Sequence, residues 1–123
     1  MRTEAEAASE LLGSLNMHLK RGQVAYDNYI TSGKKFLYAK ILKNNNERIR
    51  QLIMTQGHCL PPKQQTDAID LVAHIDIWDV LWEDLSSDKV HGLNDEFSFE
   101  NVATFPKESV ASLITYYSTI ISQ

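Results

Sequence analysis

Apolar residues recur along most of the chain at the three-to-four-residue spacing that places them on one face of an α-helix. The first such stripe passes through Leu11 and Leu15 and continues across Gly22 without a change of phase. A helix could end at Gly22, after the C-cap-like run LKRG, but the unchanged phase favours continuation to Gly33, which supplies a C-cap. The pattern therefore predicts a first helix over about 3–31. A glycine on the contact face would let a second helix approach closely at that level.

The next stripe predicts a helix over about 33–56 and contains one polar residue where the apolar face should be continuous. Ile41, Ile49 and Ile53 share that face, and Asn45 lies in the middle of it. An asparagine on an apolar seam typically fixes the register or the oligomeric state of a helix at some cost in stability. We therefore expect Asn45 to specify how this helix pairs.

The third predicted helix, over about 63–86, is apolar on two sides, which indicates burial on two sides. Its first stripe comprises Ala68, Leu71, Ile75, Trp78, Trp82 and Leu85. Its second stripe comprises Ile69, Ala73, Ile77, Val80 and Leu81. A four-helix monomer buries one stripe, so the other requires a cover from the segment 97–105 or from a second copy of the chain.

A fourth helix is predicted over about 105–122, after a long stretch in which Phe97 and Phe99 alternate with polar residues. Four helices joined mostly by short connections predict an all-α protein, an antiparallel four-helix bundle with a long irregular loop before its last helix. The whole chain, 1–123, reads as one domain, because 123 residues with 43% hydrophobic side chains suffice for a single core.

Composition favours a reducing, aqueous compartment. Cys59 is the only cysteine, so no disulfide forms within the chain. The first ten residues are rich in acids and alanines and lack the apolar region of a secretory signal. No apolar run approaches the ~18 residues of a transmembrane helix. We therefore expect a cytoplasmic protein without a membrane partner.

Charge is divided unevenly between the two halves of the chain. Residues 1–63 contain ten Lys/Arg and five Asp/Glu, whereas residues 64–123 contain two and eleven, so the halves carry +5 and −9. Such asymmetry indicates two complementary surfaces that meet each other or meet partners of opposite sign.

Two groups of side chains in the third predicted helix have the spacing of metal ligands. Asp70 and His74 are one turn apart, and such a pair can offer two ligands to zinc or iron. Asp76, Asp79 and Glu83 form an acidic edge between the two apolar stripes. The structural alternative is a solvated Asp–His pair and an acidic edge that faces basic residues of the second helix.

An enzyme is the first alternative function, and it would be a metal-dependent phosphohydrolase using Asp76, Asp79 and Glu83. Acidic clusters on bundle helices bind magnesium in the all-α nucleotide pyrophosphohydrolases, where acids from two helices clamp the ions. The second predicted helix offers only Glu47, so the likeness stops at architecture. No stretch carries a catalytic or cofactor motif, and we assign no catalytic residue and no cofactor.

A nucleic-acid-binding protein is the second alternative, since the second predicted helix is basic and Lys/Arg neutralise phosphates. This helix is too long for the recognition helix of a helix-turn-helix. The net charge of −4 and the acidic second half also oppose binding. The residues that would make the contact are Lys34, Lys35, Lys40, Lys43, Arg48 and Arg50.

The function that these patterns favour is protein interaction rather than catalysis. The two-sided third helix and its tryptophans predict a small interaction or regulatory protein that works as a homodimer. The opposite charges of the two halves would help the partner choose its register. The expected contact residues are Ile69, Ala73, Ile77, Trp78, Val80, Leu81 and Trp82.

Overall fold

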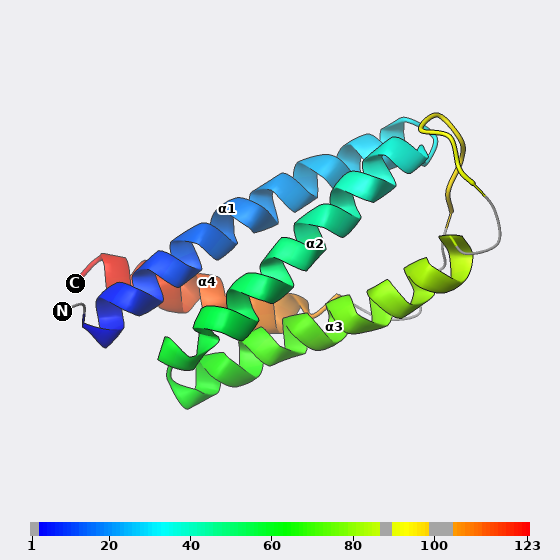
Figure 1. Cartoon of the computed structure of the whole chain (residues 1–123). Coiled ribbons are helices and arrows are strands. Elements are labelled where there is room, and N and C mark those ends of the chain that lie inside the picture. Colours follow the sequence, from blue (N-terminus) through cyan, green and yellow to red (C-terminus); the bar gives the residue numbers. More distant parts are fainter. Residues whose placement is uncertain (1–2, 87–89, 99–104) are drawn as a thin grey trace.

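The computed structural model describes residues 3–86, 90–98 and 105–123, and within them the chain is all-helical, with no strand (Figure 1). Phe99 and the rest of 99–104, which belong to the segment proposed as a cover, lie outside the described residues. The predicted helices are confirmed, with bounds that differ by at most three residues. The elements are α1 (Glu4–Thr31), α2 (Phe36–Gln56), the 3₁₀ turn η1 (Gly57–Cys59), α3 (Pro62–Ser86) and α4 (Lys107–Ile121).

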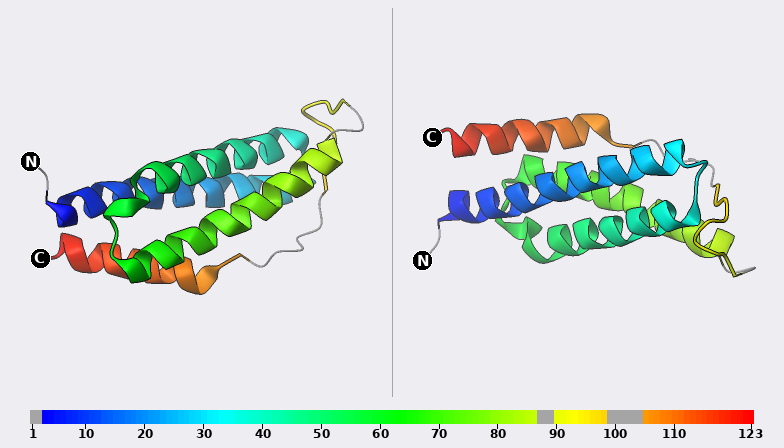
Figure 2. Two further views of the ribbon diagram at one scale, coloured as in Figure 1. Left: turned by 60° about the horizontal axis from the view of Figure 1, so that its bottom comes forward. Right: turned by 90° about the horizontal axis from the view of Figure 1, so that it is seen from above.

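The four helices pack as a bundle in which α1 lies between α2 and α4, and α3 in turn contacts both α2 and α4 (Figures 1 and 2). The α4 helix has 15 residues and α1 has 28, which corresponds to about 22 Å and 42 Å. Consequently α4 runs beside only the N-terminal part of α1 (Figure 2). In the part of the chain that is described, no helix is long and apolar enough to cross a membrane.

Two hydrophobic clusters fill the bundle, and they differ in composition. The aliphatic core lies where all four helices are present, and the aromatic core lies toward the other end. The aliphatic core consists of Ala8, Leu11, Leu12, Leu15, Ile49, Ile53, Leu60, Ala68, Leu71, Val72, Ile75, Val110 and Leu113. The aromatic core consists of Tyr29, Ala39, Trp78, Trp82 and Phe97, with Phe36, Tyr38 and Leu42 packed against it.

A polar contact between α1 and α2 separates the two cores. Asn45 is only 1% exposed, and its side-chain amide donates to the backbone oxygen of His18 over 2.8 Å. Its carbonyl oxygen accepts from Arg21 over 3.2 Å. A Cβ atom at Gly22 would lie 2.8 Å from the Asn45 nitrogen, so glycine permits this approach. The α1 helix runs unbroken through Gly22, and both hydrogen bonds of the Asn45 side chain go to α1 of the same chain.

The residues 90–98 close the aromatic end and cap α2. The α2 helix begins three residues later than predicted because Lys34, like Gly33, has a positive φ, and the turn is longer. No side chain caps the helix; instead, the amides of Phe36 and Leu37 donate to the backbone oxygens of Asp95 and Leu93 over 2.8 and 3.0 Å.

Phe97 anchors this segment in the aromatic core. Its ring centroid lies 4.7 Å from that of Trp82, and its backbone oxygen accepts a hydrogen bond from the Tyr29 hydroxyl. Burial and the charge of Glu96 raise the pKa of Tyr29, so the hydroxyl keeps the proton that it donates. The segment thereby occupies the end of the bundle that α4 does not reach.

Candidate interaction surface

The outer face of α3 carries an apolar stripe that no described part of the chain covers. Ile69, Ile77 and Val80 are 49%, 46% and 67% exposed. Ala73 is also exposed, and Leu81 is half-buried. These five residues, named here the α3 stripe, are the second stripe of the sequence pattern. Side chains four residues apart on a helix lie above one another, so they form a continuous ridge.

The two tryptophans that were grouped with this contact lie inside the chain instead. Trp78 and Trp82 are each 8% exposed and stack on one another with ring centroids 5.4 Å apart. Phe36 stacks on Trp82 at 5.6 Å. They belong to the first stripe of α3, which faces the core, so the exposed surface consists of aliphatic residues only.

The acidic edge of α3 faces the basic side of α2. Arg50 Nε lies 2.7 Å from Asp76 Oδ1, and Lys43 pairs with Glu47 while its ammonium group lies 5.9 Å from the Trp82 ring centroid. The opposite charges of the two halves therefore meet partly within one chain, along the seam between α2 and α3. Exposed pairs of this kind contribute about 0–1 kcal/mol each.

Asp79 lies at the same seam and differs from its neighbours in being half-buried. Its Oδ1 atom is buried and has no hydrogen-bond partner among the described residues. Burial raises the pKa of Asp79, with smaller contributions in the same direction from Glu47 and Asp76, and the positive charges of Lys43 and Arg50 oppose the shift. The Asp79 carboxyl group is thus partly buried beside a seam in which Arg50 pairs with Asp76 instead.

The residues considered as metal ligands do not gather into a site. Asp70 accepts a hydrogen bond from Ser109 over 2.8 Å, and the His74 ring meets the edge of Phe105 at 5.5 Å. Glu83 is exposed at the rim of α3. Over residues 3–86, 90–98 and 105–123, no three His, Cys, Asp or Glu side chains are placed to hold a metal ion together.

The six basic residues considered for nucleic-acid contact fall into three groups. Lys43 and Arg50 face α3 and its acids. Arg48 donates to the side chain of Asn44 over 3.2 Å, and the Lys40 ammonium group lies 5.7 Å from the Phe36 ring centroid. The remaining two, Lys34 and Lys35, lie in the turn before α2. The six residues do not form one continuous basic stripe, because Lys43 and Arg50 face α3.

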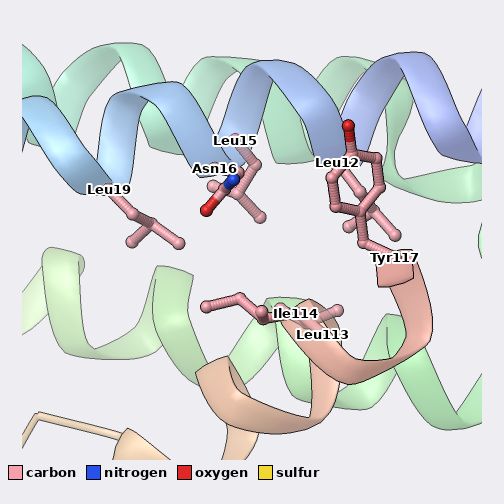
Figure 3. Close-up of a pocket in the computed structure, with 7 residues that line it drawn as sticks. All are labelled: Leu12, Leu15, Asn16, Leu19, Leu113, Ile114 and Tyr117. Atoms are coloured by element: carbon pink, nitrogen blue, oxygen red, sulfur yellow. The ribbon is translucent and has the colours of Figure 1, made fainter. Parts of the chain in front are cut away.

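The α1–α4 seam leaves a space of only about 10 Å³, lined mainly by apolar side chains (Figure 3). Leu12, Leu15 and Leu19 of α1 face Leu113 and Ile114 of α4 there. A space of this size is about that of one water molecule, so this seam is packed rather than open to a ligand.

Met54 on α2 is a further exposed apolar residue, and it was not part of the sequence prediction. Its side chain is 53% exposed. The sequence gives one sign of this exposure: Met54 is apolar but lies outside the helix face formed by Ile49 and Ile53.

No protein-family model matches the chain, and no curated protein and no solved structure is similar enough to count as a match.

Proposed function

We propose that this protein is an antiparallel four-helix bundle that acts as a small interaction or regulatory protein of the cytoplasm and assembles as a homodimer through the α3 stripe. Its function would be binding rather than catalysis. The single observation that carries the proposal is the row of half-exposed aliphatic residues Ile69, Ile77 and Val80 on one helix. Single exposed apolar residues are common on proteins, but a contiguous row marks an interaction site.

The surroundings of the row support the same function. Ala73 in its middle is small, which allows a second helix to approach the backbone of α3. Neither alternative function gains comparable support, since the acids of the α3 edge face α2 bases and the basic set is divided.

The mass of the protein in solution tests this proposal. Multi-angle light scattering at micromolar concentration should give about twice the 14.0 kDa of one chain. Ile77→Asp and Val80→Asp place a charge in the apolar contact, so each should give the mass of one chain with an unchanged far-UV circular dichroism spectrum.

Val24→Asp is the matched control, because Val24 is 61% exposed but lies on α1. It should leave the mass at twice that of the chain. A wild-type protein that remains at 14.0 kDa at the highest soluble concentration would exclude the homodimer.

A further inference from the structure

The segment 90–98 lies against the helices in the way that an extended peptide lies in a binding site. Two amides in the first turn of α2 donate to its backbone oxygens, and its Phe97 amide donates in return to the Lys34 oxygen over 2.8 Å. An isolated antiparallel β-bridge also joins Lys35 to Glu96. Backbone hydrogen bonds of this kind hold an extended chain with little dependence on its sequence, so selectivity comes from the side-chain sites beside them.

One side chain of the segment, Phe97, fills such a site between the helices. Its ring centroid lies 5.1 Å from that of Phe36 and 4.7 Å from that of Trp82. The Tyr29 hydroxyl donates to the backbone oxygen of the same residue. These three side chains, together with the first-turn amides of α2, are named here the Phe97 site. Aromatic walls and a donor for the adjacent carbonyl select an aromatic residue of an extended chain.

The segment 90–98 is fixed to the helices by few buried side chains. Phe97 is 3% exposed, and it is the only buried residue of the nine. The half-buried His91 ring contacts that of Phe36 at 5.0 Å, but its Nε2 atom is buried and has no hydrogen-bond partner among the described residues. Opening returns this atom to water, which offsets part of the loss at Phe97. We therefore expect the segment to open while the helices stay folded.

Charge at this end of the bundle indicates which kind of chain the Phe97 site accepts. Asp95 and Glu96 of the segment are exposed, and the turn that they lie against carries Lys34 and Lys35. We propose that the segment 90–98 is an autoinhibitory strap. Within its own chain it occupies a site that binds an extended acidic segment of a partner protein through an aromatic residue. The α3 stripe contributes no residue to this site, so the inference goes beyond the homodimer and does not depend on it.

Hydrogen exchange of the wild-type protein tests whether the segment opens alone. The amides of Phe36, Leu37 and Phe97 report on its hydrogen bonds, and each should be protected at least about tenfold less than the Ile75 amide of the aliphatic core. Their exchange should respond little to low urea concentrations, because local opening exposes little surface. The Ile41 amide, further into α2, is the control for fraying of that helix and should remain protected.

A synthetic peptide with the sequence of the segment, VHGLNDEFS with blocked ends, tests the binding site. In the Phe97→Ala protein the site has lost its own ring, so the peptide should bind there and change the tryptophan fluorescence, to which Trp82 contributes. It should bind wild type at least about tenfold more weakly, because the tethered segment competes at a high effective concentration.

Two altered peptides are the matched controls. The same peptide with Phe97→Ala should bind at least about tenfold more weakly, since it lacks the ring that fills the site. The peptide with Asp95→Asn and Glu96→Gln should bind about threefold more weakly at low salt and equally at high salt, because exposed charges are screened.

The outcomes separate this inference from static capping of α2. Separate opening, together with peptide binding that requires the phenylalanine, supports the strap. Exchange of the three reporter amides only together with Ile75 would overturn it, because the segment would then open only when the whole bundle unfolds. Absence of binding to a folded Phe97→Ala protein at millimolar peptide, or equal binding of the alanine peptide, would also overturn it. If circular dichroism shows Phe97→Ala to be unfolded, exchange of the wild-type protein decides alone.

The same measurements distinguish this inference from the homodimer. Ile77→Asp changes the α3 stripe but not the Phe97 site, so it should leave the exchange of the three reporter amides unchanged. A protein that is monomeric throughout would exclude the homodimer and leave the strap standing, and a strap that does not open would leave the homodimer standing.

Discussion

The aliphatic and aromatic cores of this bundle fill its interior with different helices and different kinds of side chains. In the aliphatic core, all four helices contribute, and side chains such as Leu71 and Ile75 are almost completely buried. In the aromatic core, α4 is missing, and Trp78, Trp82 and Phe97 fill the volume with large rings. The residues 90–98 take the place of the fourth helix by inserting Phe97.

The difference shows that a short fourth helix does not leave the bundle open at one end. Aromatic side chains bury about 150–250 Å² each, so few of them replace several aliphatic residues. The polar contact of Asn45 with His18 marks the boundary, and it ties α1 to α2 at the level where the composition of the core changes. The two ends should therefore respond differently to substitution.

The largest effect is expected in the aliphatic core. Leu71→Ala should lower the free energy of unfolding by about 3–5 kcal/mol, because Leu71 is 2% exposed and helices on every side prevent collapse of the cavity. Urea denaturation followed by circular dichroism measures this change. A loss under about 1 kcal/mol would contradict a rigid four-helix core.

A smaller loss is expected when the anchor of the aromatic core is removed. Phe97→Ala should cost about 2–3 kcal/mol, less than is usual for a buried phenylalanine, because a loop residue can move to fill the space. The amides of Phe36 and Leu37 should also exchange faster with deuterium, since they donate to oxygens of the same segment.

Tyr29→Phe should destabilise the same segment less than Phe97→Ala does. It removes the hydrogen bond to the Phe97 oxygen while keeping the aromatic ring, and should cost about 1 kcal/mol, with accelerated exchange at the same two amides. Unchanged exchange in both variants would show that 90–98 does not cap α2 in solution.

The close approach of α1 and α2 at the boundary between the cores can be tested with a double-mutant cycle. Gly22→Ala should destabilise the protein by about 1 kcal/mol, although alanine favours a helix by about 1 kcal/mol, because the new Cβ meets the Asn45 nitrogen. In an Asn45→Ala background the same substitution should stabilise by about 0.5–1 kcal/mol. The same sign in both backgrounds would place the two helices farther apart than the structure does.

The smallest effect is expected at Asp79. Its pKa is raised in the folded state, so the contribution of its carboxyl group to stability is present below the unfolded pKa of about 4 and is lost as pH rises through the folded value. Asp79→Asn should therefore raise Tm at pH 7, by no more than about 3 °C, and the gain should vanish near pH 3.5.

Asp76→Asn is the control for Asp79, because it removes the partner of Arg50 and should not raise Tm. Equal gains in Tm from both substitutions would assign the effect to net charge instead of to burial of Asp79.

The helices could be predicted from the sequence because their apolar stripes are long and regular. The stripe through Leu11 and Leu15 predicted α1 across Gly22, and the two-sided pattern of α3 separated the buried Leu71 from the exposed Ile77. Helix periodicity is a local property, and it reports which residues share a face. It does not report which face meets which neighbour.

The contacts between elements were decided by the tertiary structure alone. The amide of Asn45 finds its acceptor on α1, 27 residues away, and the amides of α2 find theirs in 90–98, which no local pattern encodes. The tryptophans of α3 were assigned to the exposed contact, yet they lie in the aromatic core, because α4 is too short to cover that end and large rings fill it. Local spacing determines the faces of helices, whereas packing geometry and helix length determine which of those faces remain exposed.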